Sequence, residues 1–86
     1  MKMEIDTLIH LYTKVMREYL SDQINKNTNY MDGFFKGYSA GMFRAYQDWL
    51  YNEVGRKTFD IIEEKLCRDF AEEFNMTEHE IMNIIV

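Results

Sequence analysis

A glycine stripe near the middle of the chain constrains the fold more than any other feature. Gly33, Gly37, Gly41 and Ala45 recur at every fourth residue, and aromatic residues fill many of the positions between them. On a helix this spacing places residues with almost no side chain along one slowly drifting line. Each glycine inside a helix costs about 0.5–1 kcal/mol relative to alanine. The stripe therefore indicates a helix surface that another backbone approaches closely, either within the fold or from a partner.

The length and composition predict one domain that spans residues 1–86. The chain has no proline, so no helix is broken by ring geometry. Cys67 is the single cysteine, which excludes an intramolecular disulfide and fits a reducing compartment. Residues 1–6 include acids where a secretory signal needs an apolar run, and no apolar stretch approaches the roughly 20 residues of a membrane span. We therefore expect a cytoplasmic protein.

The net charge of −5 is unevenly distributed along the chain. Residues 1–54 hold six basic and seven acidic groups, whereas residues 55–86 hold four basic and eight acidic groups. An acidic second half disfavours unaided binding to duplex DNA, which depends on cationic contacts to phosphate. It predicts a protein partner with a basic surface, or else it serves solubility alone.

Hydrophobic periodicity predicts an all-α protein, a compact bundle of about four helices. The first helix is expected over Met3–Ile24. Its polar face carries a small basic patch made of His10, Lys14 and Arg17, with Ser21 beside it. Residues 25–29 are polar and typical of a loop. A second helix, capped by Asn29 or Asp32, is then expected to end near Val54.

The second helix has a broad apolar arc and a glycine flank when it is placed on a helical wheel. The arc contains Phe34, Phe35, Tyr38, Met42, Tyr46, Trp49 and Leu50. The glycine stripe follows one edge of this arc, close to Arg44, Asp48 and Tyr51. We expect Phe34, Met42 and Trp49 to lie in the core, and Arg44 and Tyr51 to lie nearer the polar side.

A third helix is expected after Gly55, a residue typical of helix ends. Residues 56–58 then form a short connection, Thr58 caps the helix, and the helix covers Phe59–Phe74. Its inner stripe contains Phe59, Ile62, Leu66, Phe70 and Phe74, whereas Asp60, Glu63, Glu64, Glu72 and Glu73 are expected to face outward. The alternative is one uninterrupted helix through Gly55.

The fourth helix has the clearest local start signal. Thr77 and Glu80 have the spacing of a capping box, and Met76 and Ile81 have the spacing of a hydrophobic staple. The isoleucines that follow give this helix an apolar face, which is expected to be buried.

The last two predicted helices resemble the helix-turn-helix pattern of bacterial regulators. The matching positions are a small residue at Ala71, a left-handed turn residue at Asn75, apolar Met76, capping Thr77, and the packing residues Ile81 and Ile84. The resemblance covers about a fifth of the chain and implies a second helix that enters the major groove. Its exposed positions would be Glu78, His79, Met82 and Asn83, which include no arginine or lysine. We interpret the segment as helix-turn-helix geometry used for packing, with DNA binding as the alternative.

The chain lacks the residue patterns of catalytic or metal sites. A zinc site needs about four converging ligands, whereas Cys67, His10 and His79 occur at unrelated spacings. The glycines lie within a helical pattern and form no phosphate-binding loop. We therefore expect no enzyme activity and no cofactor.

These observations favour a small acidic protein-binding module that acts by occupying another protein. The candidate partner-binding residues are Gly37, Tyr38, Gly41, Arg44, Tyr51, Glu63, Glu64, Glu72 and Glu73. A narrower hypothesis is a phage or mobile-element inhibitor of a host nucleic-acid enzyme, similar to anti-CRISPR proteins, in which the acids imitate phosphates. The alternatives are a dimeric helix-turn-helix transcription regulator and a self-assembling scaffold. In each case we expect a homodimer.

Overall fold

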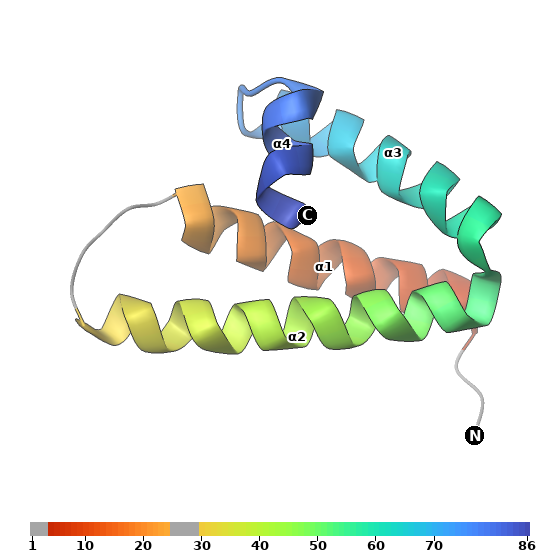
Figure 1. Ribbon diagram of the computed structural model, residues 1–86, viewed down its shortest axis with the longest axis horizontal. Coiled ribbons are helices and arrows are strands. Elements are labelled where there is room, and N and C mark those ends of the chain that lie inside the picture. The colour runs from red at the N-terminus through yellow and green to blue at the C-terminus, as the bar shows by residue number, and fades with distance from the viewer. Residues whose placement is uncertain (1–3, 25–29) are drawn as a thin grey trace.

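Four α-helices make up the fold, which confirms the predicted all-α bundle. The computed structural model describes residues 4–24 and 30–86, and of residues 30–37 it describes the backbone alone. The helices are α1 (Ile5–Ile24), α2 (Tyr30–Val54), α3 (Arg56–Glu73) and α4 (Glu78–Ile85), and no strand occurs among the described residues. α1 and α2 lie side by side and run in opposite directions, while α3 and α4 lie on one side of this pair (Figure 1).

The structure tests the predicted starts of the first two helices only in part. Met3 and Asn29, the predicted start of the first helix and one predicted cap of the second, lie outside the described residues. α2 begins at Tyr30, so Asp32 lies within the helix and does not cap it.

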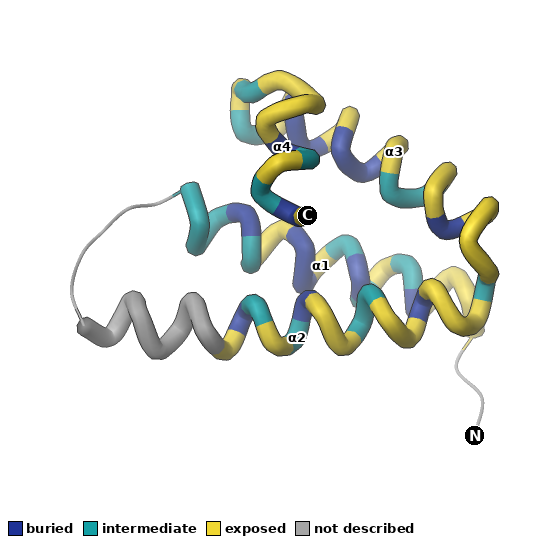
Figure 2. The backbone as a smooth tube through the Cα atoms, viewed as in Figure 1, coloured by how far each residue is buried: buried dark blue, intermediate teal, exposed yellow. Residues whose placement is uncertain are grey.

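One hydrophobic core is shared by all four helices. α1 contributes one stripe at helical spacing, and each of the other helices also has buried positions (Figure 2). The buried apolar residues are Leu8, Tyr12, Val15, Met16, Leu20, Phe43, Leu50, Phe59, Leu66, Cys67, Phe70, Ala71, Ile81 and Ile85. No described buried side-chain polar atom lacks a hydrogen-bond partner. The core therefore avoids the free-energy cost of burying unpaired polar groups there.

Three stacked aromatic rings form the centre of this core. The ring of Phe43 in α2 lies between Tyr12 and Tyr19 of α1, with centroid distances of 5.6 and 4.9 Å. Tyr12 also contacts Phe59 of α3 at 5.9 Å. The hydroxyl of Tyr19 donates to the carbonyl oxygen of Ile84 in α4 at 3.3 Å. The stack therefore connects all four helices.

A single residue, Gly55, forms the corner between α2 and α3. Its φ of 83° and ψ of 165° lie in a region that is essentially restricted to glycine. The amide of Gly55 still donates to Tyr51 of α2, and its carbonyl accepts from Phe59 of α3. The predicted break at Gly55 is confirmed, but the predicted connection and Thr58 cap are wrong. α3 begins at Arg56, because the glycine redirects the chain without a longer connection.

The turn between α3 and α4 has the local features that the sequence predicts for it. Asn75 has a positive φ of 56°, and the amide of Met76 donates to the carbonyl of Ala71 at 2.8 Å. The hydroxyl of Thr77 accepts from the Glu80 amide, and the Glu80 carboxylate accepts from the Thr77 amide, both at 3.1 Å. The left-handed residue and the capping box are thus confirmed.

Two glycine substitutions are expected to shift stability in opposite directions. An added Cβ meets nothing within 4 Å at either Gly41 or Gly55, so any effect comes from the backbone. Gly55→Ala should destabilise the protein by about 1–3 kcal/mol because alanine avoids this φ,ψ region. Gly41→Ala should stabilise it by about 0.5–1 kcal/mol because the residue is helical. Urea unfolding of both variants measures the difference, and equal effects would contradict the assigned backbone of Gly55.

Candidate functional site

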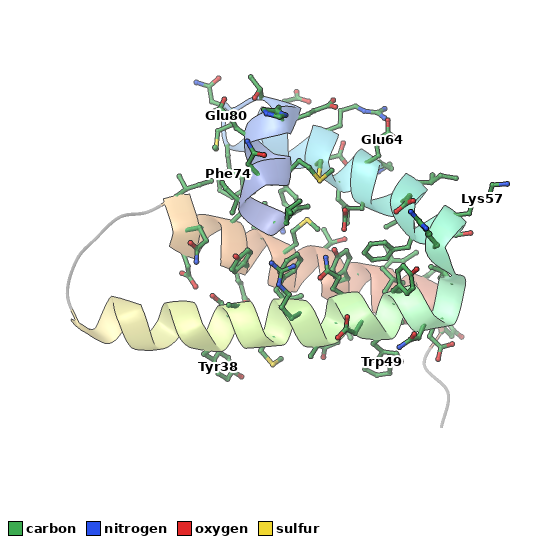
Figure 3. The ribbon with its side chains drawn as sticks, in the orientation of Figure 1. Tyr38, Trp49, Lys57, Glu64, Phe74 and Glu80 are labelled. Atoms are coloured by element: carbon green, nitrogen blue, oxygen red, sulfur yellow. The ribbon has the colours of Figure 1, made fainter. Side chains whose placement is uncertain are left out.

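A row of apolar residues on the outer face of α2, in which both aromatic members are exposed, is the strongest candidate for a binding surface. We call Tyr38, Met42, Ala45 and Trp49 the outer row. Tyr38 is 63% exposed and Trp49 is 41% exposed. Both side chains project from the same side of α2, away from the other helices (Figure 3). Large, exposed aromatic side chains that share one helix face are typical of protein-binding surfaces.

The exposure of Trp49 corrects the expectation that it lies in the core. α2 packs on α1 through Phe43 and Leu50, both fully buried. A helix turns by about 100° per residue, so Trp49 points well away from Leu50. Met42 is half-buried, which agrees in part with its predicted core position. Phe34, the third residue predicted for the core, lies outside the residues whose side chains are described.

Trp49 is held in place by a neighbouring ring. Tyr46 and Trp49 stack with centroids 5.8 Å apart and an interplanar angle of 21°. Tyr46 itself packs against the core. A braced indole loses little side-chain freedom on binding, which favours its use as an anchor.

The glycine stripe can be assessed at one of its glycines. Gly41 is exposed, and an added Cβ there meets no described atom within 4 Å. No other described backbone therefore approaches Gly41 closely, so the close approach within the fold that the stripe indicated is not seen at this position. Gly33 and Gly37 lie outside the residues whose side chains are described.

Arg44 and Tyr51, the two residues predicted for an interface, make contacts within the fold. Arg44 Nη1 donates to the carbonyl of Ile85 at 2.8 Å, and its guanidinium lies 5.1 Å from the centroid of the Phe43 ring. Tyr51 packs edge-on against Phe59 at 5.4 Å and stays 42% exposed. Arg44 thus joins α2 to α4, and Tyr51 closes the corner between α2 and α3.

Glu63 takes part in a polar bridge between three helices, in contrast to its predicted outward position. The Tyr12 hydroxyl of α1 and Nε2 of Gln47 in α2 both donate to Glu63 Oε2 at 3.4 Å. Glu63 is half-buried and supplies the acceptor that the hydroxyl of buried Tyr12 needs. Burial raises the pKa of Glu63, and the hydrogen bonds from Gln47 and Tyr12 oppose this rise. Burial and, next, the Glu63 charge raise the pKa of Tyr12.

The four predicted acids do not form one free surface. Glu73 accepts from Arg17 Nε at 2.9 Å and from Nη2 at 3.2 Å, and the same guanidinium lies over the Phe70 ring. Glu64 is exposed and lies 3.9 Å from Arg68 Nη2. Glu72 is exposed, whereas Glu63 belongs to the polar bridge. At about 100° per residue, Glu63 and Glu72 point to opposite sides of α3.

The basic patch of α1 borders a cavity that the sequence did not reveal. The cavity has a volume of about 460 Å³ and is lined by His10, Thr13, Lys14 and Arg17. The Thr13 hydroxyl donates to the carbonyl of Ile9 at 2.7 Å, and Arg17 is paired with Glu73. Two of the four lining side chains, Thr13 and Arg17, therefore already have partners within the protein.

No chemical centre is evident among the described residues. No group of three or more histidine, cysteine, aspartate or glutamate residues within residues 4–24 and 30–86 is arranged to hold a metal ion. Cys67 is buried, and burial raises the pKa of its thiol to about 11. The thiol is thus protonated at neutral pH, a state in which it is a poor nucleophile.

One property of the helices and the comparison with known proteins complete the description. In the described part of the chain, no helix combines the length and the hydropathy needed to cross a membrane. No family model, curated protein or solved structure matches this chain. The surface described above must therefore be interpreted on its own chemistry.

Neutralising Glu63 is expected to stabilise the protein at neutral pH. Its carboxyl pKa is raised in the folded state, so the folded protein binds this proton more tightly than the unfolded chain. The charged carboxylate therefore opposes folding above the raised pKa, and stability is regained as the pH falls toward the ordinary value. Glu63→Gln should increase the free energy of unfolding at pH 7, by less than about 1 kcal/mol because solvent reaches half of the side chain.

Urea unfolding at several pH values provides the test. The advantage of the Glu63→Gln variant over the natural protein should shrink as the pH is lowered to about 4, near the ordinary pKa of a glutamate. Glu64→Gln, an exposed neighbour, serves as the control and should change stability little at either pH. Destabilisation by Glu63→Gln at pH 7 would show that the carboxylate charge itself is needed.

Proposed function

We propose that this chain is a small acidic protein-binding module that acts by occupying another protein through the outer row of α2. The single observation that supports the proposal is the exposure of Trp49 and Tyr38 on a helix face that no described helix covers. Tryptophan and tyrosine are the residues most often found at the energetic centre of protein interfaces.

The shape and charge of the outer row indicate which kind of partner surface can bind to it. Gly41 and Ala45 lie between Tyr38 and Trp49 along the helix, and their small size leaves the backbone accessible in the middle of this face. A helix of the partner can therefore approach the α2 backbone closely between Tyr38 and Trp49. Asp48 is exposed beside the row, and the whole chain carries a charge of −5. A partner with an apolar strip and a basic rim complements this arrangement.

Removing both aromatic anchors should abolish partner capture without unfolding the protein. Tagged protein is used to capture partners from a lysate of its source, and the eluate is identified by mass spectrometry. Tyr38→Ala with Trp49→Ala should reduce recovery by at least about tenfold, the effect expected for two interface anchors. Ile61→Ala, an exposed apolar residue on α3, is the matched control and should not affect capture. Undiminished capture by the double variant would exclude the outer row as the binding surface.

A narrower proposal is that the occupied protein is a nucleic-acid enzyme of a host, blocked by a phage or mobile-element inhibitor of the anti-CRISPR kind. Its support is the small size and the acidity of the chain, with four basic and eight acidic groups in residues 55–86. The exposed acids Glu64 and Glu72 are the residues that would face a basic channel. Such a complex weakens as salt rises, because its charges are screened.

A second candidate function is a dimeric helix-turn-helix transcription regulator. The left-handed Asn75 and the capping box of α4 favour it, since both belong to the turn of that motif. Glu78 and His79 lie at the start of α4, where the motif contacts DNA, and neither Met82 nor Asn83 adds a fixed positive charge. Carboxylates in this position repel phosphate.

The second candidate is tested by measuring fluorescence anisotropy of labelled genomic fragments. We expect no binding to any fragment at low salt, because the exposed positions of α4 lack cationic residues. A salt-sensitive complex that is lost in Asn83→Ala but kept in Glu64→Gln would instead support the regulator.

We further propose that the protein works in the cytoplasm. The support is its single cysteine, which is buried and has no second cysteine with which to form an intramolecular disulfide.

A further inference from the structure

The outer row has the spacing of a coiled-coil seam. Tyr38, Met42, Ala45, Trp49 and Asn52 follow one another at steps of four, three, four and three residues. This alternation has a mean of 3.5 residues and keeps one line of side chains facing a second helix over its whole length. In the sequence the same steps extend back to Phe35 and Met31.

α2 therefore has two apolar faces, and the described residues fully cover only one of them. The inner face includes Phe43 and Leu50, which are fully buried against α1 and its neighbours. Tyr38, Ala45 and Trp49 of the outer row are exposed, and Tyr38 and Trp49 project away from the bundle (Figure 3). Met42 is half-buried and also packs against the core. A second helix with a matching seam would bury these side chains.

We propose that a second copy of the chain supplies this helix, and that the two α2 helices pair antiparallel through their outer rows. The inference rests on the proposed function in one respect, because it takes the outer row to be a binding surface, and it adds self-association as a second use of that surface. In this register Tyr38 faces Trp49 of the second copy, and Met42 faces Ala45. The pairing is two-fold symmetric and closed, so it stops at a dimer.

The sizes of the side chains select the antiparallel direction. A parallel pair would place two tryptophans in one layer and two alanines in the next, which overfills the first and leaves a gap in the second. The antiparallel register joins the long Met42 to the short Ala45 in both central layers. At each end it joins an indole to a phenol, a pair suited to offset stacking.

Charge does not oppose this pairing within the seam itself. None of Tyr38, Met42, Ala45, Trp49 and Asn52 carries a charge. The two copies do repel each other through their net charge of −5 each, and this long-range repulsion is screened by salt. Self-pairing should therefore strengthen as salt rises, whereas capture of a basic partner should weaken. The seam is short, so the dimer belongs to the class of small interfaces that dissociate readily.

Sedimentation equilibrium over a wide concentration range tests whether the pairing exists. We expect a monomer–dimer equilibrium that shifts toward the dimer at high salt. Ala45→Lys places a charge in the central layer of the seam and should shift the equilibrium toward monomer by at least about tenfold. Ile61→Lys changes the net charge equally at an exposed site on α3 and should leave the equilibrium unchanged or slightly favour the dimer. Both variants replace exposed residues, and their folding is checked by circular dichroism.

A spin label at one site tests the direction of the pairing. Asn52→Cys is labelled in a Cys67→Ala background. Electron–electron double resonance measures a long distance between the two labels, and dipolar broadening of the continuous-wave spectrum detects a short one. The antiparallel register separates the two copies of position 52 by about 25 Å along the helix axis. A parallel pair would bring them to about 10 Å, close to the interaxial distance.

The outcomes separate this inference from the proposed function. A salt-strengthened dimer that is lost in Ala45→Lys and gives the long label distance supports the antiparallel pair. A short distance, or a dimer that is indifferent to Ala45→Lys, overturns it. A monomer at every concentration also overturns it, yet the proposed function stands if Tyr38→Ala with Trp49→Ala still abolishes capture of another protein. If that capture is unaffected while the dimer is lost, the proposed function fails and the outer row serves self-association alone.

Discussion

The stack of Tyr12, Phe43 and Tyr19 is the interaction on which the rest of the bundle depends. The three rings fix the spacing of α1 and α2, with centroid distances of 5.6 and 4.9 Å. The outer ends of the stack then reach the remaining helices, through Phe59 of α3 and the Ile84 carbonyl of α4. A small domain gains few contacts elsewhere, so aromatic rings that touch several helices at once contribute a large share of its cohesion.

The polar contacts of the bundle follow from this aromatic centre. Burying Tyr12 brings its hydroxyl into the interior, where Glu63 accepts its hydrogen bond and Gln47 donates to the same carboxylate. Arg44 extends the chain of contacts to α4 by donating to Gln47 and to the Ile85 carbonyl. The acids of α3 therefore differ in role, and the net charge of the chain does not by itself define a binding face. Tyr38 and Trp49 on the outer face of α2, by contrast, stay largely exposed among the described residues.

Local signals in the sequence predicted the elements of the fold well. The apolar spacing of α1, the break at Gly55, the positive φ of Asn75 and the capping box of Thr77 and Glu80 all depend on neighbouring residues only. Thr58 was misassigned because threonine is a common cap, whereas the conformation of Gly55 made a further cap unnecessary.

Properties that depend on residues far apart in the chain were harder to predict from the sequence. Periodicity shows that α2 has a broad apolar arc, but it does not show how much of that arc the other helices cover, and Trp49 was placed in the core for this reason. Glu63 was expected outside because its need to satisfy Tyr12, 51 positions away in sequence, leaves no local trace. The exposed part of the candidate site thus became visible only when the packing of α2 was known.

The burial of Cys67 has a consequence for the study of motion in this protein. The thiol lies in the core face of α3 with 2% of its surface exposed, and it is the only cysteine in the chain. A thiol reagent reaches it only when α3 separates locally from its neighbours, so the rate of modification measures how often that separation occurs. The natural sequence therefore carries a chemical reporter for the opening of its second half, and no mutation is needed to introduce one.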